Sequence, residues 1–242
     1  YLACLVSNCI VCQCRYMRDD LARLAPFFRS KMIVLYNGVE SLPSFSSSST
    51  ISCRGLQIKD FVFIASSNKP QKSLDTLLKA LRNIPEEVRP FCVIAGIAGD
   101  DLEFQALLSE HDLADSHVFL AGNVENIYTY ITASRCSVLC SKYEGFSNFA
   151  LEVAACGVRL VLSRSPGGNS ELALVYPNIN WFDVGDWLEL SRLILLPGRT
   201  ASPADLDNVR FNFNVEAIHH RYLSLLLNRR LDSQSLAISV SP

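Results

Sequence analysis

Two acidic side chains, Glu144 and Glu152, are eight positions apart in a segment that favours anion binding. Gly145 permits a tight turn after an apolar run, and the spacing of apolar residues predicts a helix that starts near Asn148. The first turn of a helix carries unpaired backbone N–H groups and the positive end of the helix dipole, so it can bind a phosphate group. One carboxylate in the loop and one in the second helical turn would flank this site, and paired acceptors suit the vicinal hydroxyl groups of a sugar. The alternative is that both are solvated surface residues, because acidic side chains are favoured early in a helix in any case.

The elements that position these residues follow from the hydrophobic pattern. Short apolar runs predict strands, and stretches with helical spacing alternate with them. We expect strands over 61–65, 91–95, 117–120, 137–140, 159–162 and 180–182, and helices over 74–81, 101–111, 124–133, 148–156 and 212–227. This alternation, with apolar strands, predicts an α/β fold with a doubly wound parallel sheet covered on both faces. Ligands bind such folds at the carboxyl ends of the strands, where Glu144 is expected.

The chain divides into unequal parts by composition. Seven of the twelve residues over 41–52 are serines, which is typical of a linker. We therefore expect an N-terminal piece over 1–38, a Ser-rich linker over 39–58, the main α/β domain over 59–230 and a flexible tail over 231–242. The N-terminal piece contains a helical stretch over 16–28 and a strand over 32–36 that is closed by the turn pair Asn37-Gly38. About forty residues are too few to form a core of their own.

Composition excludes several classes of protein. Hydrophobic residues make up 49% of the 242 residues, which is enough for a sizeable core and excludes disorder for the bulk of the chain. The formal net charge is −2 and the isoelectric point is about 6.1, so no overall basic field favours nucleic acid. The longest nearly uncharged apolar run, over 1–14, is shorter than the roughly 20 residues that a membrane-spanning helix needs.

Nine cysteines are an odd number in a chain too large to need disulfide bonds for stability. Cys9, Cys12 and Cys14 lie close together in the sequence and raise the alternative of a zinc site. A zinc site requires a second pair of ligands at a matching spacing, and the sequence contains no such pair. We therefore expect reduced, structural thiols in a cytoplasmic setting.

The segment over 144–157, with its E-x7-E spacing, resembles the signature of the family 4 (group 1) glycosyltransferases of GT-B fold. Other segments resemble family motifs in the same order along the chain: 15–21, 33–40 (IVLYNGVE), 69–81 (KPQKSLDTLLKAL), 95–100 (AGIAGD), 117–124 (HVFLAGNV) and 165–172 (SPGGNSEL). The resemblance covers roughly 10–228. It implies that the main domain is the donor-binding domain of a GT-B enzyme and that the N-terminal piece is a remnant of the other domain.

The resemblance also implies a role for individual residues. Glu144 would hold hydroxyl groups of the donor sugar, Glu152 would hold the ribose of the nucleotide, and Lys72 would neutralise the leaving diphosphate. Lys69 would supply a second positive charge. The remaining donor contacts would come from the turn and helix start and from a turn near the base: Gly145, Phe146, Ser147, Asn148, Gly122 and Asn123. The alternative for Lys72 is an ordinary exposed lysine at the start of a helix.

Two positions depart from the family pattern. The family usually pairs the lysine that corresponds to Lys72 with an arginine five residues earlier, and this chain has Ser67 there. Ser73 replaces a common glycine. Lys69 would have to compensate for the missing arginine, although a lysine is a point donor without the planar fork of a guanidinium.

The resemblance implies a retaining transfer of a sugar from a UDP- or GDP-linked donor, with no cofactor and no metal ion. The acceptor would be a glycan or a lipid-linked molecule. Peripheral contact with the inner face of a membrane is compatible with such an acceptor, although no basic amphipathic stretch supports it. We expect the chain to be truncated at its N-terminus and inactive alone. The alternatives are a non-catalytic remnant that binds nucleotide sugars and a nucleotide-sugar epimerase.

Overall fold

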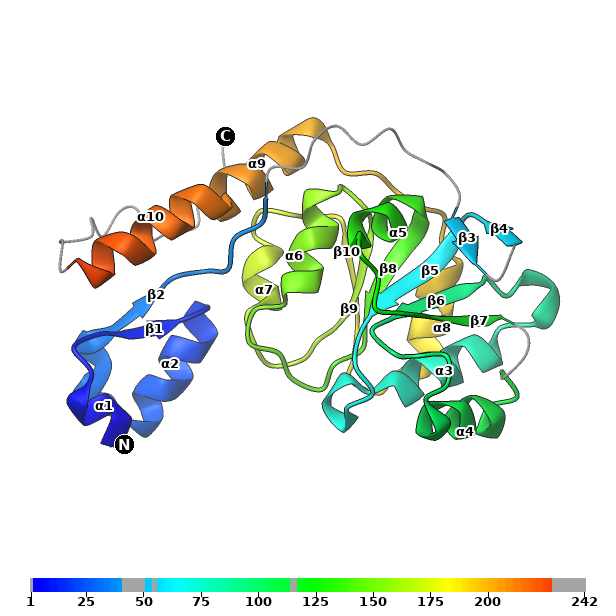
Figure 1. The fold of residues 1–242 in the computed structure, drawn as a ribbon, viewed down its shortest axis with the longest axis horizontal. Coiled ribbons are helices and arrows are strands. Elements are labelled where there is room, and N and C mark those ends of the chain that lie inside the picture. Colours follow the sequence, from blue (N-terminus) through cyan, green and yellow to red (C-terminus); the bar gives the residue numbers. More distant parts are fainter. Residues whose placement is uncertain (1, 41–50, 54–55, 114–116, 228–242) are drawn as a thin grey trace.

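A six-stranded parallel sheet forms the centre of the main domain in the computed structural model, which describes residues 2–40, 51–53, 56–113 and 117–227 (Figure 1). Its strands are β5 (Phe61–Ala65), β6 (Cys92–Ala95), β7 (Val118–Gly122), β8 (Ser134–Leu139), β9 (Leu160–Ser163) and β10 (Ile179–Phe182). Their order is β10-β9-β8-β5-β6-β7, and every neighbouring pair is parallel. The chain therefore starts in the middle of the sheet, runs to one edge, and returns to the other side of β5. This confirms the doubly wound α/β fold and places a topological switch point between β5 and β8.

Helices cover both faces of this sheet. The alternation of side chains along β5 explains how, because Phe61 and Phe63 point to one face while Val62 and Ile64 point to the other. The first face packs against α5 (Ile127–Ala133), α6 (Asn148–Ala155), α7 (Asn169–Leu172) and α9 (Pro203–Phe213). The second face packs against α3 (Leu74–Asn83), α4 (Leu102–Glu110) and α8 (Trp187–Leu195). The core of the main domain thus has two layers, one on each face of the sheet.

The N-terminal segment, defined here as residues 2–40, forms a small unit beside the main domain. It contains α1 (Leu2–Val6), β1 (Ile10–Cys12), α2 (Arg15–Leu24), a 3-10 helix η1 (Pro26–Lys31) and β2 (Met32–Val34), and the two strands pair in parallel. The backbone of Val39 bonds to Phe213 O (2.8 Å) and accepts from Val215 N (3.2 Å), which ties the segment to the start of α10 (Val215–Leu226). Figure 1 shows α10 and the N-terminal segment at the same end of the molecule.

Several element boundaries differ from the sequence prediction. Part of the predicted linker over 39–58 forms the antiparallel strand pair of β3 (Ile51–Cys53) and β4 (Leu56–Ile58), because Ile51 and Ile58 are buried against the main domain. The rest of the Ser-rich stretch, over 41–50, and the predicted tail lie outside the described residues. The helix predicted over 212–227 begins at Val215, since Asn214 caps a new helix through its side chain. The helical stretch over 16–28 is interrupted after Leu24, where Pro26 starts the 3-10 turn. The helices α8 and α9 were not predicted.

No helix within the described ranges combines the length and the apolar character that crossing a membrane requires.

Ser73 adopts a left-handed backbone conformation (φ 50°, ψ 44°) at the start of α3. This conformation is costly for any residue with a Cβ atom and free of that cost for glycine. We expect Ser73→Gly to raise the free energy of unfolding by about 1 kcal/mol, measured by chemical denaturation. The Ser73 hydroxyl contacts the Thr76 hydroxyl at 3.0 Å, so Ser73→Ala is the matched control that removes this contact and keeps the strain. A glycine variant no more stable than the alanine variant would contradict the prediction.

Candidate functional site

The switch point of the sheet brings two charged side chains together from distant parts of the sequence. Lys72 ends a short 3-10 helix, η2 (Pro70–Lys72), in the connection that follows β5, and Glu144 lies in the loop that follows β8. Lys72 Nζ is 2.7 Å from Glu144 Oε1, and both side chains are largely buried. The two loops are also joined through Gln71, whose side chain donates to Tyr143 O (2.8 Å) and whose carbonyl accepts from Lys142 N (2.8 Å). The two predicted catalytic residues thus form one ion pair at the expected edge of the sheet.

Glu144 is held by groups that the sequence analysis did not identify. Ser141 Oγ donates to Glu144 Oε1 at 2.5 Å, and the fully buried Ser141 is itself fixed because its carbonyl accepts from Ser163 Oγ (2.6 Å). The backbone N–H of Glu144 donates to Pro166 O at 3.0 Å. The sequence did offer one signal for Ser141, because it is a polar residue directly after an apolar strand. Its hydrogen bond to Glu144 could not be predicted from the spacing of the residues.

The start of α6 offers backbone donors next to this pair. Ser147 is the N-cap, and its side chain accepts from Ala150 N (3.2 Å). Within the described part of the chain, the backbone N–H groups of Phe146, Ser147 and Asn148 donate no hydrogen bond. Such donors at a helix start are the arrangement that binds a phosphate group.

The N-terminal segment contacts this helix start directly. Asn37 Nδ2 donates to Phe146 O (3.2 Å) and to Asn148 Oδ1 (2.6 Å), and Asn37 Oδ1 accepts from Gln13 Nε2 (3.2 Å). The sequence analysis treated Asn37 only as part of a turn. Its contacts with Phe146 and Asn148 span more than a hundred residues, so no local pattern could have revealed them.

Close backbone packing fixes the loop on its other side. Gly168 N donates to Gly145 O at 2.5 Å, and a Cβ atom on Gly167 (φ +138°) would overlap the carbonyl group of Glu144. A Cβ atom on Gly145 would approach the Met17 and Gln13 side chains. The consecutive glycines are therefore required for the loop that carries Glu144 to reach its position.

Glu152 lies on α6 in the second turn, as predicted, and its surroundings differ from those of Glu144. Burial raises the pKa of the Glu152 carboxyl group above its usual value. Burial and then the nearby Glu152 charge raise the pKa of Tyr128, on α5, to about 12. The Glu152 side chain accepts no hydrogen bond from any described residue. It is therefore a half-buried carboxylate with its acceptor capacity unused.

The remaining predicted site residues lie along the same edge of the sheet. Lys69 is exposed and precedes η2, with no ion pair to a described carboxylate. Gly122 ends β7 with a positive φ of 63°, and its carbonyl accepts from Gly96 N (2.7 Å), which follows β6. Asn123 is exposed just beyond it. This turn lies at the carboxyl ends of β6 and β7, two strands away from the switch point.

A buried carboxylate joins the N-terminal segment to the main domain. Glu171 accepts from the backbone N–H groups of Arg15 (3.1 Å) and Tyr16 (3.0 Å), at the start of α2, and from the Tyr36 hydroxyl (2.6 Å). Burial and the hydrogen bond to Glu171 raise the pKa of Tyr36. A carboxylate at a helix N-terminus is a favourable pairing, so α2 is anchored beside the loop of Glu144.

An apolar groove of about 500 Å³ lies between α2 and this loop. Val11, Met17 and Leu24 of the N-terminal segment form one wall, and Tyr143 and Pro166 of the main domain form the other. Glu144 and Gly145 also line the groove, so it opens onto the ion pair.

The cysteines do not form a metal site among the described residues. No group of three or more His, Cys, Asp and Glu side chains in those ranges could hold a metal ion. The eight cysteines whose side chains are described are all free thiols, and burial raises the pKa of Cys136 to about 11 and that of Cys156 to about 12. Thiols with raised pKa values are poor nucleophiles at neutral pH, as expected for structural cysteines.

Comparison with known proteins gives one family. The family described as "Glycosyl transferases group 1" matches residues 56–196, which is more than half of the chain. No curated protein matches the chain significantly.

Solved structures share the fold at low sequence identity. HepE from Anabaena, in complex with UDP and glucose, matches with a TM-score of 0.75 and 18% identity over 93% of this chain and 64% of that chain. Sucrose-phosphate synthase from Thermosynechococcus elongatus matches with a TM-score of 0.70 and 19% identity over 92% of this chain and 58% of that one. The pneumococcal O-GlcNAc transferase GtfA, in complex with UDP and GlcNAc, matches with a TM-score of 0.69 and 16% identity over 91% and 45%. This chain therefore spans less than two thirds of the length of each of these proteins.

Because the Lys72–Glu144 pair is largely buried, we expect that breaking it lowers the free energy of unfolding more than breaking an exposed ion pair does. Lys72→Met would leave the Glu144 carboxylate with Ser141 as its remaining side-chain donor, and we expect a loss of about 1–3 kcal/mol in the free energy of unfolding. Lys79→Met is the matched control, because Lys79 pairs with Asp75 at 2.8 Å on the exposed side of α3 and should cost less than about 1 kcal/mol. Equal losses in the two variants, measured by urea denaturation, would contradict the prediction.

Proposed function

Because the chain belongs to the group 1 glycosyltransferases, we propose that it binds a nucleotide sugar at the switch point of its sheet and that the full enzyme transfers the sugar to an acceptor. The observation that carries this proposal is the Lys72–Glu144 pair beside three backbone N–H groups at the start of α6 that donate no hydrogen bond to a described residue. A cation and a row of backbone donors suit a diphosphate, and a neighbouring carboxylate suits the hydroxyl groups of the sugar attached to it.

Lys72 would form an ion pair with the diphosphate and balance part of its negative charge. In this proposal its oxygens accept from the backbone N–H groups of Phe146, Ser147 and Asn148, and from Lys72 Nζ. The acceptor hydroxyl oxygen would form the new bond to the anomeric carbon as the bond between the sugar and the diphosphate breaks. The electron pair of the broken bond would go to the phosphate oxygen, which would also take the acceptor's proton, and Lys72 would stabilise the negative charge that develops on the diphosphate. This supports transfer without a metal ion, with Lys69 as a second charge where the family has an arginine.

The sugar and the nucleoside would lie on either side of this diphosphate. Glu144, oriented by Ser141, would accept from hydroxyl groups of the donor sugar. Glu152 would accept from the ribose, which fits its unused acceptor capacity. The turn of Gly122 and Asn123 would lie near the base. Retention of configuration at the anomeric carbon is proposed from the family resemblance.

The acceptor would approach through the groove beside α2. The groove opens onto Glu144, and its apolar walls support an acceptor with an apolar portion, either a glycan that packs through the faces of its sugars or a lipid-linked molecule. We propose a cytoplasmic enzyme that contacts the inner face of a membrane when the acceptor is lipid-linked.

A second candidate function is binding without transfer. Ser67 in place of the usual arginine removes one positive charge from the expected diphosphate site. This observation favours a non-catalytic nucleotide-sugar-binding protein. The family match disfavours the epimerase alternative, because the matched family is that of the group 1 glycosyltransferases.

Calorimetric titration with UDP- and GDP-linked sugars tests the proposed donor site. We expect saturable binding of at least one of them. Glu144→Ala should weaken binding of that nucleotide sugar by about tenfold, since a charged hydrogen-bond acceptor to the sugar is lost. The same variant should bind the corresponding nucleoside diphosphate at least as well as the wild type, because Lys72 is freed from its partner.

Glu103→Ala, on the exposed side of α4, is the control and should change neither affinity. Failure of every nucleotide sugar to bind would overturn the donor-site proposal. Binding of the donor, together with no transfer by a chain that contains both GT-B domains, would favour the non-catalytic candidate.

The hydrogen bonds of Asn37 to the start of α6 lead to a second prediction, an effect on phosphate binding alone. Asn37→Ala removes the two hydrogen bonds that orient Phe146 O and Asn148 Oδ1, so the backbone donors at the start of α6 should lose their alignment. We expect weaker binding of UDP, by about fivefold to tenfold, and unchanged binding of uridine, which has no phosphate. Asn83→Ala, which removes a hydrogen bond to Ser191 on the far face, is the matched control. Equal losses for UDP and uridine would indicate a general structural effect and contradict this positioning role.

A further inference from the structure

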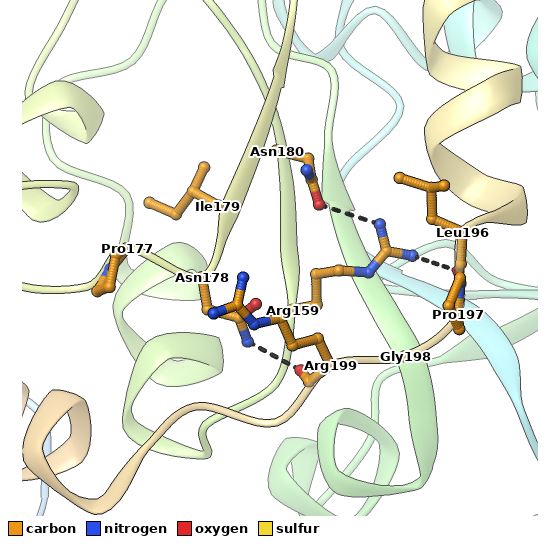
Figure 2. A pocket seen from close by; sticks show the side chains of 9 residues that line it. All are labelled: Arg159, Pro177, Asn178, Ile179, Asn180, Leu196, Pro197, Gly198 and Arg199. Carbon is orange, nitrogen blue, oxygen red and sulfur yellow. Dashed lines mark hydrogen bonds between the residues drawn. The ribbon is translucent and has the colours of Figure 1, made fainter.

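A second pocket lies at the amino-terminal ends of the strands, whereas the candidate donor site lies at their carboxyl-terminal ends (Figure 2). Its volume is about 460 Å³. Arg159 directly precedes β9 and Asn178 directly precedes β10, so the pocket lies at the amino-terminal ends of these strands, and the segment after α8 closes its other side. Neither the proposed function nor the family resemblance uses any of its residues.

Arg159 places a buried positive charge in this pocket. Its side chain is almost fully buried (3% exposed), and it donates from Nη1 to Asn180 Oδ1 (3.2 Å) and Leu193 O (3.0 Å) and from Nη2 to Leu196 O (2.9 Å). Its Nε has no hydrogen-bond partner within the described ranges. These three bonds use three of the five N–H donors of a guanidinium group.

The charge of Arg159 is not balanced by a carboxylate. No described acidic side chain forms an ion pair with it, and its partners are one amide and two carbonyl groups at the end of α8. Carbonyl groups at a helix end carry only partial charge. A buried cation without a counter-ion is costly, so a bound anion would be stabilised here.

The rest of the pocket wall also carries polar and positively charged groups. Arg199 is exposed, and its guanidinium group has no ion pair or hydrogen bond to the described residues, while its carbonyl accepts from Asn178 Nδ2 (2.8 Å). Figure 2 shows Arg159, Asn178, Asn180 and Arg199 in the middle of the pocket, with Ile179 on one side and Leu196 on the other. The lining thus contains two cations, two amides and no acidic residue.

We propose that this pocket binds a small phosphorylated molecule, with the phosphate near the two arginines and its body against Ile179 and Leu196. Guanidinium groups pair with phosphate oxygens through short, charge-assisted hydrogen bonds, and two of them match the double negative charge of a phosphate monoester. The cavity is larger than a phosphate ion alone and has room for one sugar ring. The site is separate from the donor site, so it would allow a metabolite to bind at the same time as the donor.

The test uses Lys72→Met as the background, because that variant lacks the cation of the donor site. We expect glucose 6-phosphate to bind saturably in calorimetric titration and glucose to show no binding. Adding Arg199→Ala should weaken the binding of glucose 6-phosphate by about tenfold or more. Arg199 is exposed, so the variant is expected to fold, and thermal unfolding without ligand checks this. Arg192→Ala, which removes an exposed arginine of α8 that pairs with Glu189, is the matched control and should leave the affinity unchanged.

Inorganic phosphate separates two sources of the anion. Equal affinity for inorganic phosphate and glucose 6-phosphate, both sensitive to Arg199→Ala, supports the site with free phosphate as its ligand. Absence of saturable binding overturns the proposal, and so does an equal loss of affinity in the Arg199 and Arg192 variants, which would indicate non-specific attraction of anions. These outcomes are independent of nucleotide-sugar binding, which the background variant does not report.

Discussion

The ion pair between Lys72 and Glu144 is the interaction on which the candidate site depends. The two residues are far apart in the sequence, and they meet because β5 and β8 are neighbours where the order of the strands reverses. The pair is largely removed from water, so it requires further hydrogen bonds to be stable. Ser141 supplies one to Glu144, and the backbone of Pro166 fixes the loop. The position of the Glu144 carboxylate is therefore determined by three separate loops of the main domain.

The N-terminal segment belongs structurally to this site although it is a separate unit in the fold. Glu171 anchors the start of α2, and Asn37 reaches across to the start of α6. Both contacts join the segment to the same face of the main domain, beside the loop of Glu144. Any motion of the segment relative to the main domain would consequently change the groove beside α2 and the alignment of the backbone donors together. In the proposed function, these few hydrogen bonds would couple donor binding to the access of an acceptor.

The sequence predicted what is local and missed what is distant. Strands such as β5 were predicted because every residue of FVFIA is apolar, and a strand buried on both faces requires this. The pair of β3 and β4 was missed because these short strands contain Ser52 and Gln57 and follow a run of serines. The start signals of α8 and α9 were present, as Asp186 and Ser202 both cap their helices through side chains. The apolar residues of α8 also have helical spacing, at Leu190, Leu193 and Ile194, so α8 could have been predicted from the sequence. The contacts of Asn37 with the start of α6 could not be predicted, since Phe146 and Asn148 lie more than a hundred residues away in the sequence.

The carboxyl-terminal ends of the strands (the carboxyl edge) and their amino-terminal ends (the amino edge) each carry a largely buried cation, Lys72 and Arg159. The two cations differ in whether a carboxylate balances their charge, and this difference affects which anions could bind. At the carboxyl edge, Lys72 already has Glu144 as its partner, so an incoming diphosphate must share Lys72 with that carboxylate. Sharing would draw Lys72 toward the phosphate and leave Glu144 Oε1 with Ser141 alone, which frees acceptor capacity for a sugar hydroxyl group. A diphosphate that carries a sugar thus compensates both members of the pair, whereas a simple phosphate compensates only the lysine. At the amino edge, Arg159 has no carboxylate partner among the described residues, so a simple phosphate meets no such competition there. Under the two proposals, the charge arrangement would therefore select nucleotide sugars at the carboxyl-terminal ends of the strands and phosphate monoesters at the amino-terminal ends.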